Sequence, residues 1–242
     1  MLRACLLVYP FLAVYVTLGT LIFVPVTWLT GNIRPIYWVS RQGVRGALWL
    51  SGVKLDLIDF PNASKSLPAL FVSNHISNLE PAALFMVLPR VAAILKKELG
   101  RIPLLGYVMG LGGFVYVDRR ARDSRRKALE AGAETLRKGI SLMVFPEGTR
   151  SLDGQLLPFR PGPFSMAIDA QAAIVPITVY GTRELMPKGS LAIRPGRIAI
   201  RFHESIPTEG CSNADRQELM ARAREVIERS LDENPLRPGQ SA

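Results

Sequence analysis

The feature that most constrains this chain is an uncharged, strongly apolar stretch near its N-terminus, residues 4–33. The stretch is too apolar for an ordinary surface helix, so it must contact lipid or a deep core. Because a bilayer needs only about 20 apolar residues, one straight helix over the whole stretch would be too long. Pro10, Gly19 and Pro25 are places where it can break, which predicts a bent helix or a shallow hairpin.

A cleaved signal peptide and a buried core helix both fit this stretch less well. A signal peptide would have an apolar region of only about 7–15 residues and a small-x-small site. A helix buried in a soluble core would need a larger surrounding protein than the remaining residues provide. Positive charges at Arg3, Arg34, Arg41 and Arg45 flank the stretch, so we expect a membrane-associated protein on the cytoplasmic face of the inner (plasma) membrane.

Length and charge limit the rest of the chain. Its 242 residues suffice for one sizeable α/β domain and a modest appendage. The net charge of +10 predicts attraction to polyanions, which include nucleic acid, anionic lipid and phosphorylated metabolites. The basic cluster at 119–126 has no interleaved aromatic residues to stack bases, so no nucleic-acid partner is expected. Cys5 and Cys211 form no CxxC pair, which favours a reducing compartment.

The pattern after residue 60 alternates between strands and helices, which predicts an α/β sheet. Apolar runs predict strands at 69–72, 114–117, 140–145, 174–180 and 198–203. Helical spacing predicts helices at 81–88, 123–139, 164–170 and 219–231. We therefore divide the chain into a helical membrane segment with its connector (1–60), a soluble domain (61–234) and a loose tail (235–242).

Some residues receive specific predictions within these elements. Pro81 is expected at the first helical position, which leaves Glu80 outside that helix. Asp123 or Ser124 is expected to cap the next helix. His203 belongs to the alternating strand at 198–203, with Arg197 and Arg201 on the same side, and is expected to face solvent, without a role.

His75 and Glu80 form the candidate catalytic pair. A neutral imidazole is suited to taking a proton from a hydroxyl at neutral pH. On an ideal helix, residues five apart would point about 140° away from each other, so the pair meets only if residues 76–79 form a turn. Asn78 and Pro81 favour such a turn, and Glu80 would then orient His75 and stabilise its imidazolium form. The alternative is that His75 is an ordinary structural histidine.

Two segments just past predicted strands carry groups suited to binding phosphate. In 145-FPEGTRS-151 the chain turns through Gly148 and presents an acid, hydroxyls and a guanidinium together. In 112-GGFVYVDR-119 another arginine lies just past a strand, where its fork-shaped guanidinium can bind a phosphate through two hydrogen bonds. Either arginine alone is more often a surface charge, so the prediction rests on the combination.

Taken together, these segments resemble the 1-acylglycerol-3-phosphate acyltransferase (lysophosphatidate acyltransferase) family over residues 67–189. The order and spacing of four short blocks carry the resemblance. Residues 74-NHISNLE-80 look like its Asn-His-x4-Asp catalytic block, and 113-GFVYVDR-119 looks like its second, acceptor-binding block. The third block matches at 145-FPEGTR-150, and 174-IVPI-177 looks like the fourth.

The resemblance implies a fold, a reaction and a set of site residues. The fold is a mixed sheet flanked by helices with an N-terminal membrane-embedded helical motif, in which residues 61–234 are the acyltransferase domain. His75 and Glu80 are implied as catalytic residues. The substrate-binding residues implied are Asn74, Lys96, Lys97, Gly113, Arg119, Glu147, Gly148, Thr149, Arg150 and Pro176.

The chemistry implied is direct transfer of an acyl group, without a metal, a cofactor or an acyl-enzyme intermediate. His75 would deprotonate the free hydroxyl of 1-acylglycerol-3-phosphate, which attacks a thioester of coenzyme A or acyl carrier protein and yields phosphatidic acid. The expected partners are therefore lysophosphatidate, the acyl thioester and membrane lipids.

One residue departs from the family pattern, because Glu80 stands where the family usually has Asp. A carboxylate is still supplied, so an active enzyme with a slightly rearranged pair is expected. The departure leaves open another acceptor, such as a lyso-ornithine lipid or a lysophospholipid. A non-catalytic homologue that keeps the fold and binds membrane lipid is also left open.

Overall fold

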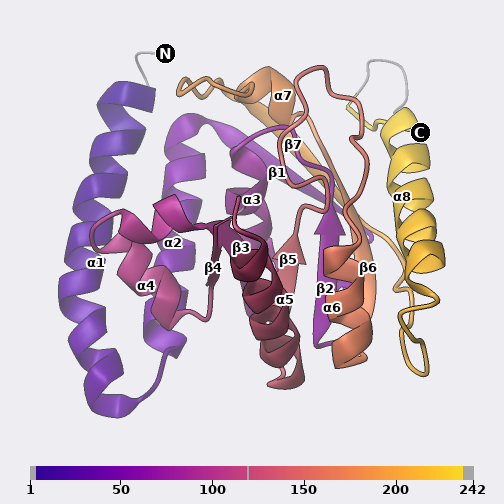
Figure 1. Cartoon of the computed structure of the whole chain (residues 1–242). Coiled ribbons are helices and arrows are strands. Elements are labelled where there is room, and N and C mark those ends of the chain that lie inside the picture. Colours follow the sequence, from indigo (N-terminus) through magenta and orange to yellow (C-terminus); the bar gives the residue numbers. More distant parts are fainter. Residues whose placement is uncertain (1–3, 119, 237–242) are drawn as a thin grey trace.

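The computed structural model describes residues 4–118 and 120–236, which form a sheet between two layers of helices (Figure 1). The strands are β1 (Val53–Ile58), β2 (Ala69–Ser73), β3 (Val91–Lys96), β4 (Val115–Val117), β5 (Ser141–Val144), β6 (Ala173–Tyr180) and β7 (Gly196–Phe202). The α-helices are α1 (Tyr9–Thr30), α2 (Arg34–Ser51), α3 (Leu79–Val87), α4 (Leu105–Leu111), α5 (Arg122–Arg137), α6 (Gly162–Ala170), α7 (Thr182–Leu185) and α8 (Arg216–Asp232). Shorter turns of other helix types are η1 (Ala4–Val8), η2 (Phe60–Ala63) and η3 (Lys97–Arg101).

The seven-stranded sheet has the order β1-β7-β6-β2-β5-β3-β4. Strands β6, β2, β5, β3 and β4 run parallel to one another, whereas β7 pairs antiparallel with β6 and parallel with β1. The prediction of a mixed sheet flanked by helices is therefore confirmed. Because parallel strands end at the same edge, the loops that follow β2, β5 and β6 meet there.

Each face of the sheet has its own apolar core. On one face Phe71 of β2 packs with Leu84 of α3 and with residues of α2. On the other face Leu70 packs with Phe164 of α6, Ile227 of α8 and residues of α5. Successive strand residues point to opposite faces, so a strand covered on both sides reads as a continuous apolar run. This explains why β2, which is buried along its whole length, could be predicted.

Most of the N-terminal stretch forms one long helix, which pairs with α2 in a helical hairpin whose turn lies later than expected. Helix α1 continues through Pro25 and ends at Thr30, and Gly31 (φ 65°) then reverses the chain into α2. The predicted break at Pro10, Gly19 or Pro25 is wrong. Pro10 lies in the first helical turn, where proline is accepted, and α1 continues through Gly19 and Pro25 without ending. Among the described residues, Leu6–Thr30 is the one helical stretch whose length and apolar composition would allow it to cross a membrane.

The starts of α3 and α5 also differ from prediction. Helix α3 begins at Leu79, so Glu80 lies within its first turn instead of before it. Proline is accepted in that turn because the N–H groups there have no partner within the helix. Helix α5 begins at Arg122, and Ser124 does not cap it: the Ser124 hydroxyl instead accepts a hydrogen bond from the Asp118 N–H at 2.9 Å.

Strands β1 and β3 are not predicted from the sequence, and the expected boundary at residue 60 is misplaced because β1 lies before it. β1 pairs with β7 along its length, so it belongs to the sheet and not to a connector. Its sequence, VKLDLI, mixes charges into a partly exposed edge strand, and β3, VAAILK, contains alanines that are uncommon in strands. Neither sequence therefore has a clear strand pattern.

His203 does not face solvent as expected. It lies at the end of β7, and its Nε2 is 2.9 Å from the hydroxyl of Thr178, which is fully buried. Burial, together with the nearby Arg201 guanidinium, lowers the pKa of His203 to about 4. Alternation fails as a guide here because β7 lies inside the sheet and both of its faces are covered.

Candidate active site

The candidate site lies where three parallel strands end. His75 follows β2, residues 145–151 follow β5, and Thr182 follows β6. These strands are neighbours in the order β6-β2-β5, so segments far apart in the sequence meet at one edge of the sheet. This is the edge at which parallel α/β sheets bind ligands.

The expected turn after His75 is present and joins the pair. His75 Nδ1 lies 2.7 Å from Glu80 Oε2. The Glu80 carboxylate also accepts the N–H groups of Ile76 (3.0 and 2.9 Å) and Ser77 (2.9 Å) and the hydroxyl of Thr182 (2.6 Å). Glu80 is fully buried and cannot be hydrated. These donors therefore supply the hydrogen bonds that water would otherwise provide.

These contacts explain how glutamate serves where the family usually has aspartate. Glu80 is in the first turn of α3, where the helix dipole favours a negative charge. Its side chain extends back over the turn to the backbone of residues 76 and 77 and to His75. The result is an imidazole–carboxylate pair at normal hydrogen-bond distance. It favours the tautomer in which Nδ1 carries the proton and donates it to the carboxylate, which leaves Nε2 able to accept a proton.

The imidazole is held from several sides. Its ring stacks on Phe145 with the ring centroids 4.1 Å apart. The His75 N–H donates to Glu147 Oε1 at 2.7 Å, and the His75 carbonyl accepts the Ser151 N–H at 2.8 Å. Its side chain is 14% exposed, and among the described residues no hydrogen bond reaches Nε2. A base with a fixed ring and an accessible Nε2 can take a proton from a hydroxyl.

Glu147 supports the loops around the site. Its two carboxyl oxygens accept the backbone N–H groups of His75 and of Leu157 (3.0 Å), so it links the end of β2 to the loop before α6. Burial raises the pKa of this carboxyl to about 7, against the opposing effect of its two backbone hydrogen bonds. The sequence-based assignment of Glu147 to substrate binding stays a prediction, and its visible contacts are structural.

We expect Glu147→Gln to change how stability depends on pH. The folded-state pKa of about 7 exceeds the ordinary value of 4.5, so the folded protein binds more protons than the unfolded chain between these values. Through this group, the free energy of unfolding therefore falls by up to about 3 kcal/mol as pH rises from 4.5 to 7. Urea unfolding of both proteins from pH 4.5 to 8 measures the difference between their slopes, in which the opposite contribution of His203 cancels. Identical slopes would show that folding does not shift the pKa of Glu147.

Two further predicted site residues have structural contacts. Asn74 acts as an extension of the backbone ladder, because its amide donates to the Val179 carbonyl and accepts from the Val179 N–H, both at 2.9 Å. Pro176 lies inside the sheet, paired with Val72, and its carbonyl accepts the His203 N–H at 3.0 Å.

Gly148 is required by its backbone conformation. It has φ 71°, and a Cβ at this position would lie 2.5 Å from Arg160 Nε. Glycine therefore allows both the left-handed turn and the close approach of the arginine. Gly113 also has a positive φ, 87°, at the turn before β4.

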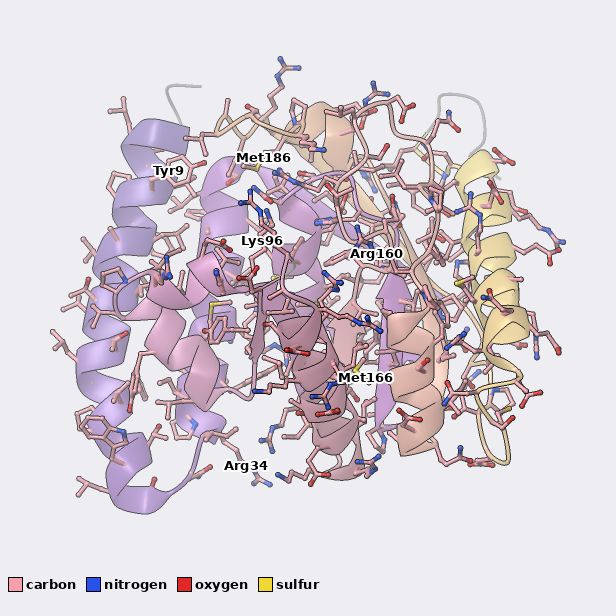
Figure 2. All side chains as sticks on the ribbon, in the orientation of Figure 1. Tyr9, Arg34, Lys96, Arg160, Met166 and Met186 are labelled. Carbon is pink, nitrogen blue, oxygen red and sulfur yellow. The ribbon has the colours of Figure 1, made fainter. Side chains whose placement is uncertain are left out.

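The basic residues predicted to bind phosphate are in different states. Arg150 is partly buried, and among the described residues its guanidinium has no hydrogen bond or ion pair. Lys97 forms an ion pair with Asp118, whereas Lys96 is exposed at the end of β3 and lies on the same side of the molecule as Arg160 (Figure 2). Thr149 is exposed. Arg119 lies outside the described residues.

An apolar cavity of about 320 Å³ lies between the sheet and helices α1, α2 and α4. Its lining includes Gly19 of α1, Gly43 of α2, Phe85 of α3 and Met143 of β5. A Cβ on Gly43 would lie 2.6 Å from the Tyr15 ring, so glycine is what allows α1 and α2 to pack this closely. The cavity therefore depends on the same hairpin that carries the apolar stretch.

Some contacts that fix the pair join distant segments and have no signal in the sequence. Phe145 was visible within a matching block, but nothing in the sequence indicates that its ring stacks on His75. Thr182 is separated from Glu80 by 102 residues, and no local pattern marks it as a partner of the carboxylate. Ser77, whose hydroxyl donates to the Met186 carbonyl at 2.6 Å, fixes the turn against the segment that follows α7.

Fold and site together define a class of α/β proteins with a histidine–carboxylate pair at the carboxyl edge of a mostly parallel sheet. Residues 58–180 match the family model described as Acyltransferase, and the chain belongs to this family. A solved structure, the 1-acyl-sn-glycerophosphate (LPA) acyltransferase PlsC from Thermotoga maritima, superimposes with a TM-score of 0.74 at 25% identity, covering 92% of this chain and 95% of that one.

Curated relatives come from several lineages. A 1-acyl-sn-glycerol-3-phosphate acyltransferase of Chlamydomonas reinhardtii is 38% identical over 86% of this chain and 58% of its own length. The chloroplastic enzyme LPAT1 of Arabidopsis thaliana is 34% identical over 87% of this chain and 54% of its own length. The Borreliella burgdorferi enzyme of the same description is 28% identical over 82% and 80%. The chain thus spans little more than half of the first two relatives.

Proposed function

We propose that this protein transfers a fatty acyl group from a thioester to the free hydroxyl of 1-acylglycerol-3-phosphate, which yields phosphatidic acid. The observation that carries the proposal is the 2.7 Å contact of His75 Nδ1 with the buried Glu80 carboxylate, together with the accessible Nε2. The names of the curated relatives and of the Thermotoga maritima structure support the choice of acceptor.

In the proposed reaction His75 acts as a general base and then as a general acid. Nε2 takes the proton of the acceptor hydroxyl while its oxygen attacks the thioester carbonyl carbon. The tetrahedral intermediate then breaks its carbon–sulfur bond, and the imidazolium returns the proton to the departing thiolate. Glu80 stabilises the imidazolium between these steps and does not itself take the proton. The products are an ester and a free thiol.

Release of thiol provides the test. Purified protein with palmitoyl-CoA should release free coenzyme A only when lysophosphatidate is added, and phosphatidic acid should form in equal amount. Parallel reactions replace the donor by palmitoyl-acyl carrier protein, and the acceptor by a lyso-ornithine lipid or lysophosphatidylcholine. Faster transfer to one of the latter would replace the proposed acceptor. Lipid binding without thiol release from any combination would indicate a non-catalytic homologue.

We propose that Arg150 binds the acceptor phosphate, because its guanidinium is unpaired among the described residues and lies in the loop that contacts His75. Arg150→Lys keeps the charge but removes the rigid two-pronged donor, at a cost of about 1.5–3 kcal/mol for a charged hydrogen bond. The KM for lysophosphatidate should therefore rise about tenfold to a hundredfold, while the donor KM stays the same. Two-substrate kinetics of wild type, Arg150→Lys and Arg119→Lys measures this. A rise in the donor KM alone would assign the arginine to the coenzyme phosphates.

We also propose that α1 embeds in the cytoplasmic leaflet of the inner membrane and that the cavity beside it holds an acyl chain. The attachment is supported by three apolar side chains of α1 that are largely exposed, Val14 (60%), Leu18 (54%) and Leu21 (62%). Residues at these spacings lie along one helix face, and such a face is unfavourable in water.

Charges on this face should therefore weaken attachment. We expect the double substitution Leu18→Glu and Leu21→Glu to move most of the protein from the membrane pellet to the supernatant, since a carboxylate in hydrocarbon is costly. Sedimentation of native membranes measures this, with Leu57→Glu on edge strand β1 as the control. If the double variant sediments like wild type, α1 is not the membrane-binding element.

A further inference from the structure

A second hollow lies far from the catalytic pair. This basic cleft, about 650 Å³ in volume, is lined by α2, the last turn of α3 and the residue before β3. Arg90 precedes the amino end of β3, whereas His75 follows the carboxyl end of β2, which runs in the same direction. Figure 2 shows Arg34 at the opposite end of the molecule from Met186, whose carbonyl contacts the turn beside Glu80. The cleft is therefore distinct from the candidate active site.

Four arginines line the basic cleft: Arg34, Arg41, Arg45 and Arg90. The three on α2 are spaced seven and four residues apart, which places them along one helix face. None of the lining residues is acidic. Among the described residues, the exposed guanidiniums of Arg34, Arg45 and Arg90 have no ion pair or hydrogen bond. Four like charges around one hollow repel each other, and a bound anion would relieve that repulsion.

The cleft is also partly preorganised. Arg41 donates to the Met86 carbonyl at the end of α3, with Nε at 2.9 Å, and its second contact to the same oxygen fixes the guanidinium plane. The hydroxyl of Tyr37 is fixed by the backbone of Val91, whose N–H donates to it at 2.7 Å. A ligand that enters therefore meets one positioned guanidinium and several free ones, with little ordering cost for the first contact.

The surroundings of the cleft indicate which anion it takes. Trp38 lies on the arginine face of α2, lines the cleft and is 61% exposed, and the apolar side chains of Ile33 and Met86 also line it. An exposed tryptophan beside arginines is typical of the level at which lipid phosphates lie in a membrane. An isolated soluble anion would not require this apolar rim. We infer that the basic cleft binds the phosphate of an anionic phospholipid headgroup. This inference rests on the proposed attachment of α1 to the membrane.

A short-chain lipid tests the cleft without a bilayer. Dihexanoyl phosphatidylglycerol is titrated into the full-length protein in a nonionic detergent, and tryptophan fluorescence is followed. Wild type should show a saturable change, whereas dihexanoyl phosphatidylcholine should give none. The variant Arg34→Gln, Arg45→Gln, Arg90→Gln should bind at least about tenfold more weakly, because each basic group near a lipid phosphate contributes appreciably. Arg41 is left intact because it also stabilises the end of α3.

A matched variant separates the cleft from net charge. Arg126→Gln, Arg222→Gln, Arg229→Gln removes the same charge from exposed positions of α5 and α8, and it should bind like wild type. Thermal unfolding of both variants verifies that they fold. The fluorescence response should be lost in Trp38→Phe and kept in Trp49→Phe, which alters the same helix outside the cleft.

Several results would overturn the inference. Equal weakening of lipid binding in the two triple variants would show that binding depends on net charge and not on the cleft. Inorganic phosphate that competes as well as the lipid would show a simple anion site, and equal binding of phosphatidylcholine would show a non-selective surface. Sedimentation with pure phosphatidylcholine vesicles tests the membrane attachment separately. A protein that fails there, yet binds the short-chain anionic lipid through the three arginines, would refute the attachment and leave the cleft as a phospholipid site.

Discussion

Replacing His75 by alanine is expected to lower the turnover of acyl transfer by about a hundredfold or more while the protein still folds. The reason is that Nε2 is the one base placed to take the acceptor proton among the described residues that form the site, since Glu80 is buried and Glu147 is occupied by two backbone N–H groups. The main-chain bonds of His75 to Glu147 and Ser151 do not depend on its side chain, so the loops should keep their positions.

The measurement is single-turnover thiol release at saturating lysophosphatidate and palmitoyl-CoA, with thermal unfolding as the check on folding. Loss of the ring also removes the stack on Phe145, so a moderate drop in stability is expected. A folded His75→Ala protein with near-normal turnover would show that the proton goes elsewhere. The role of His75 as base would then be wrong.

Removing the charge of Glu80 is expected to be nearly as damaging. In Glu80→Gln the amide nitrogen cannot accept the hydrogen bonds that now converge on the carboxylate from Ile76, Ser77 and Thr182. The imidazolium also loses its counter-charge, and a carboxylate-to-amide change at an equivalent position of a catalytic triad lowers kcat by about 10⁴. We expect a loss of about 10² or more in kcat.

The conservative variant Glu80→Asp provides the matched comparison. It keeps the charge but shortens the arm by one methylene, so activity should fall by much less than in Glu80→Gln. Steady-state kinetics with both substrates measures this. In Glu80→Gln the loss should fall on kcat, because Glu80 acts on the proton transfer and not on substrate binding. If both variants are equally and mildly impaired, Glu80 only stabilises the start of α3.

Much of this architecture could be predicted because local patterns encode it. The strand before His75 and the strand at 174–180 are buried on both faces, so their continuous apolar runs are unambiguous. The pairing of His75 with Glu80 is local as well, since a single turn determines it. Edge strand β1 gave no such signal, because half-exposed strands mix charged and apolar residues.

What could not be predicted depends on contacts between distant segments. No property of Thr182 or Phe145 in the sequence identifies them as neighbours of the pair, because only the strand order brings the ends of β6 and β5 beside β2. The exposure of His203 was predicted wrongly for the same reason, because whether one face of an alternating strand meets solvent depends on which other segments cover it. The turn lies at Gly31 and not at the expected breaks, because proline is accepted at a helix start and a proline inside a helix can bend it without ending it.

The separate origins of the catalytic pair and the apolar cavity have a consequence for how such enzymes diversify. The contacts that fix His75 and Glu80 come from the ends of β2, β5 and β6, and among the described residues none comes from α1 or α4. The cavity wall, by contrast, is built largely from α1, α2 and α4. Mutations that widen or shorten that wall can accumulate without disturbing the proton transfer. If the cavity holds the acyl chain, as proposed above, selection on membrane fluidity can change the preferred chain length. Chimaeras that exchange these helices between relatives should then take their chain preference from the helices and their chemistry from the sheet.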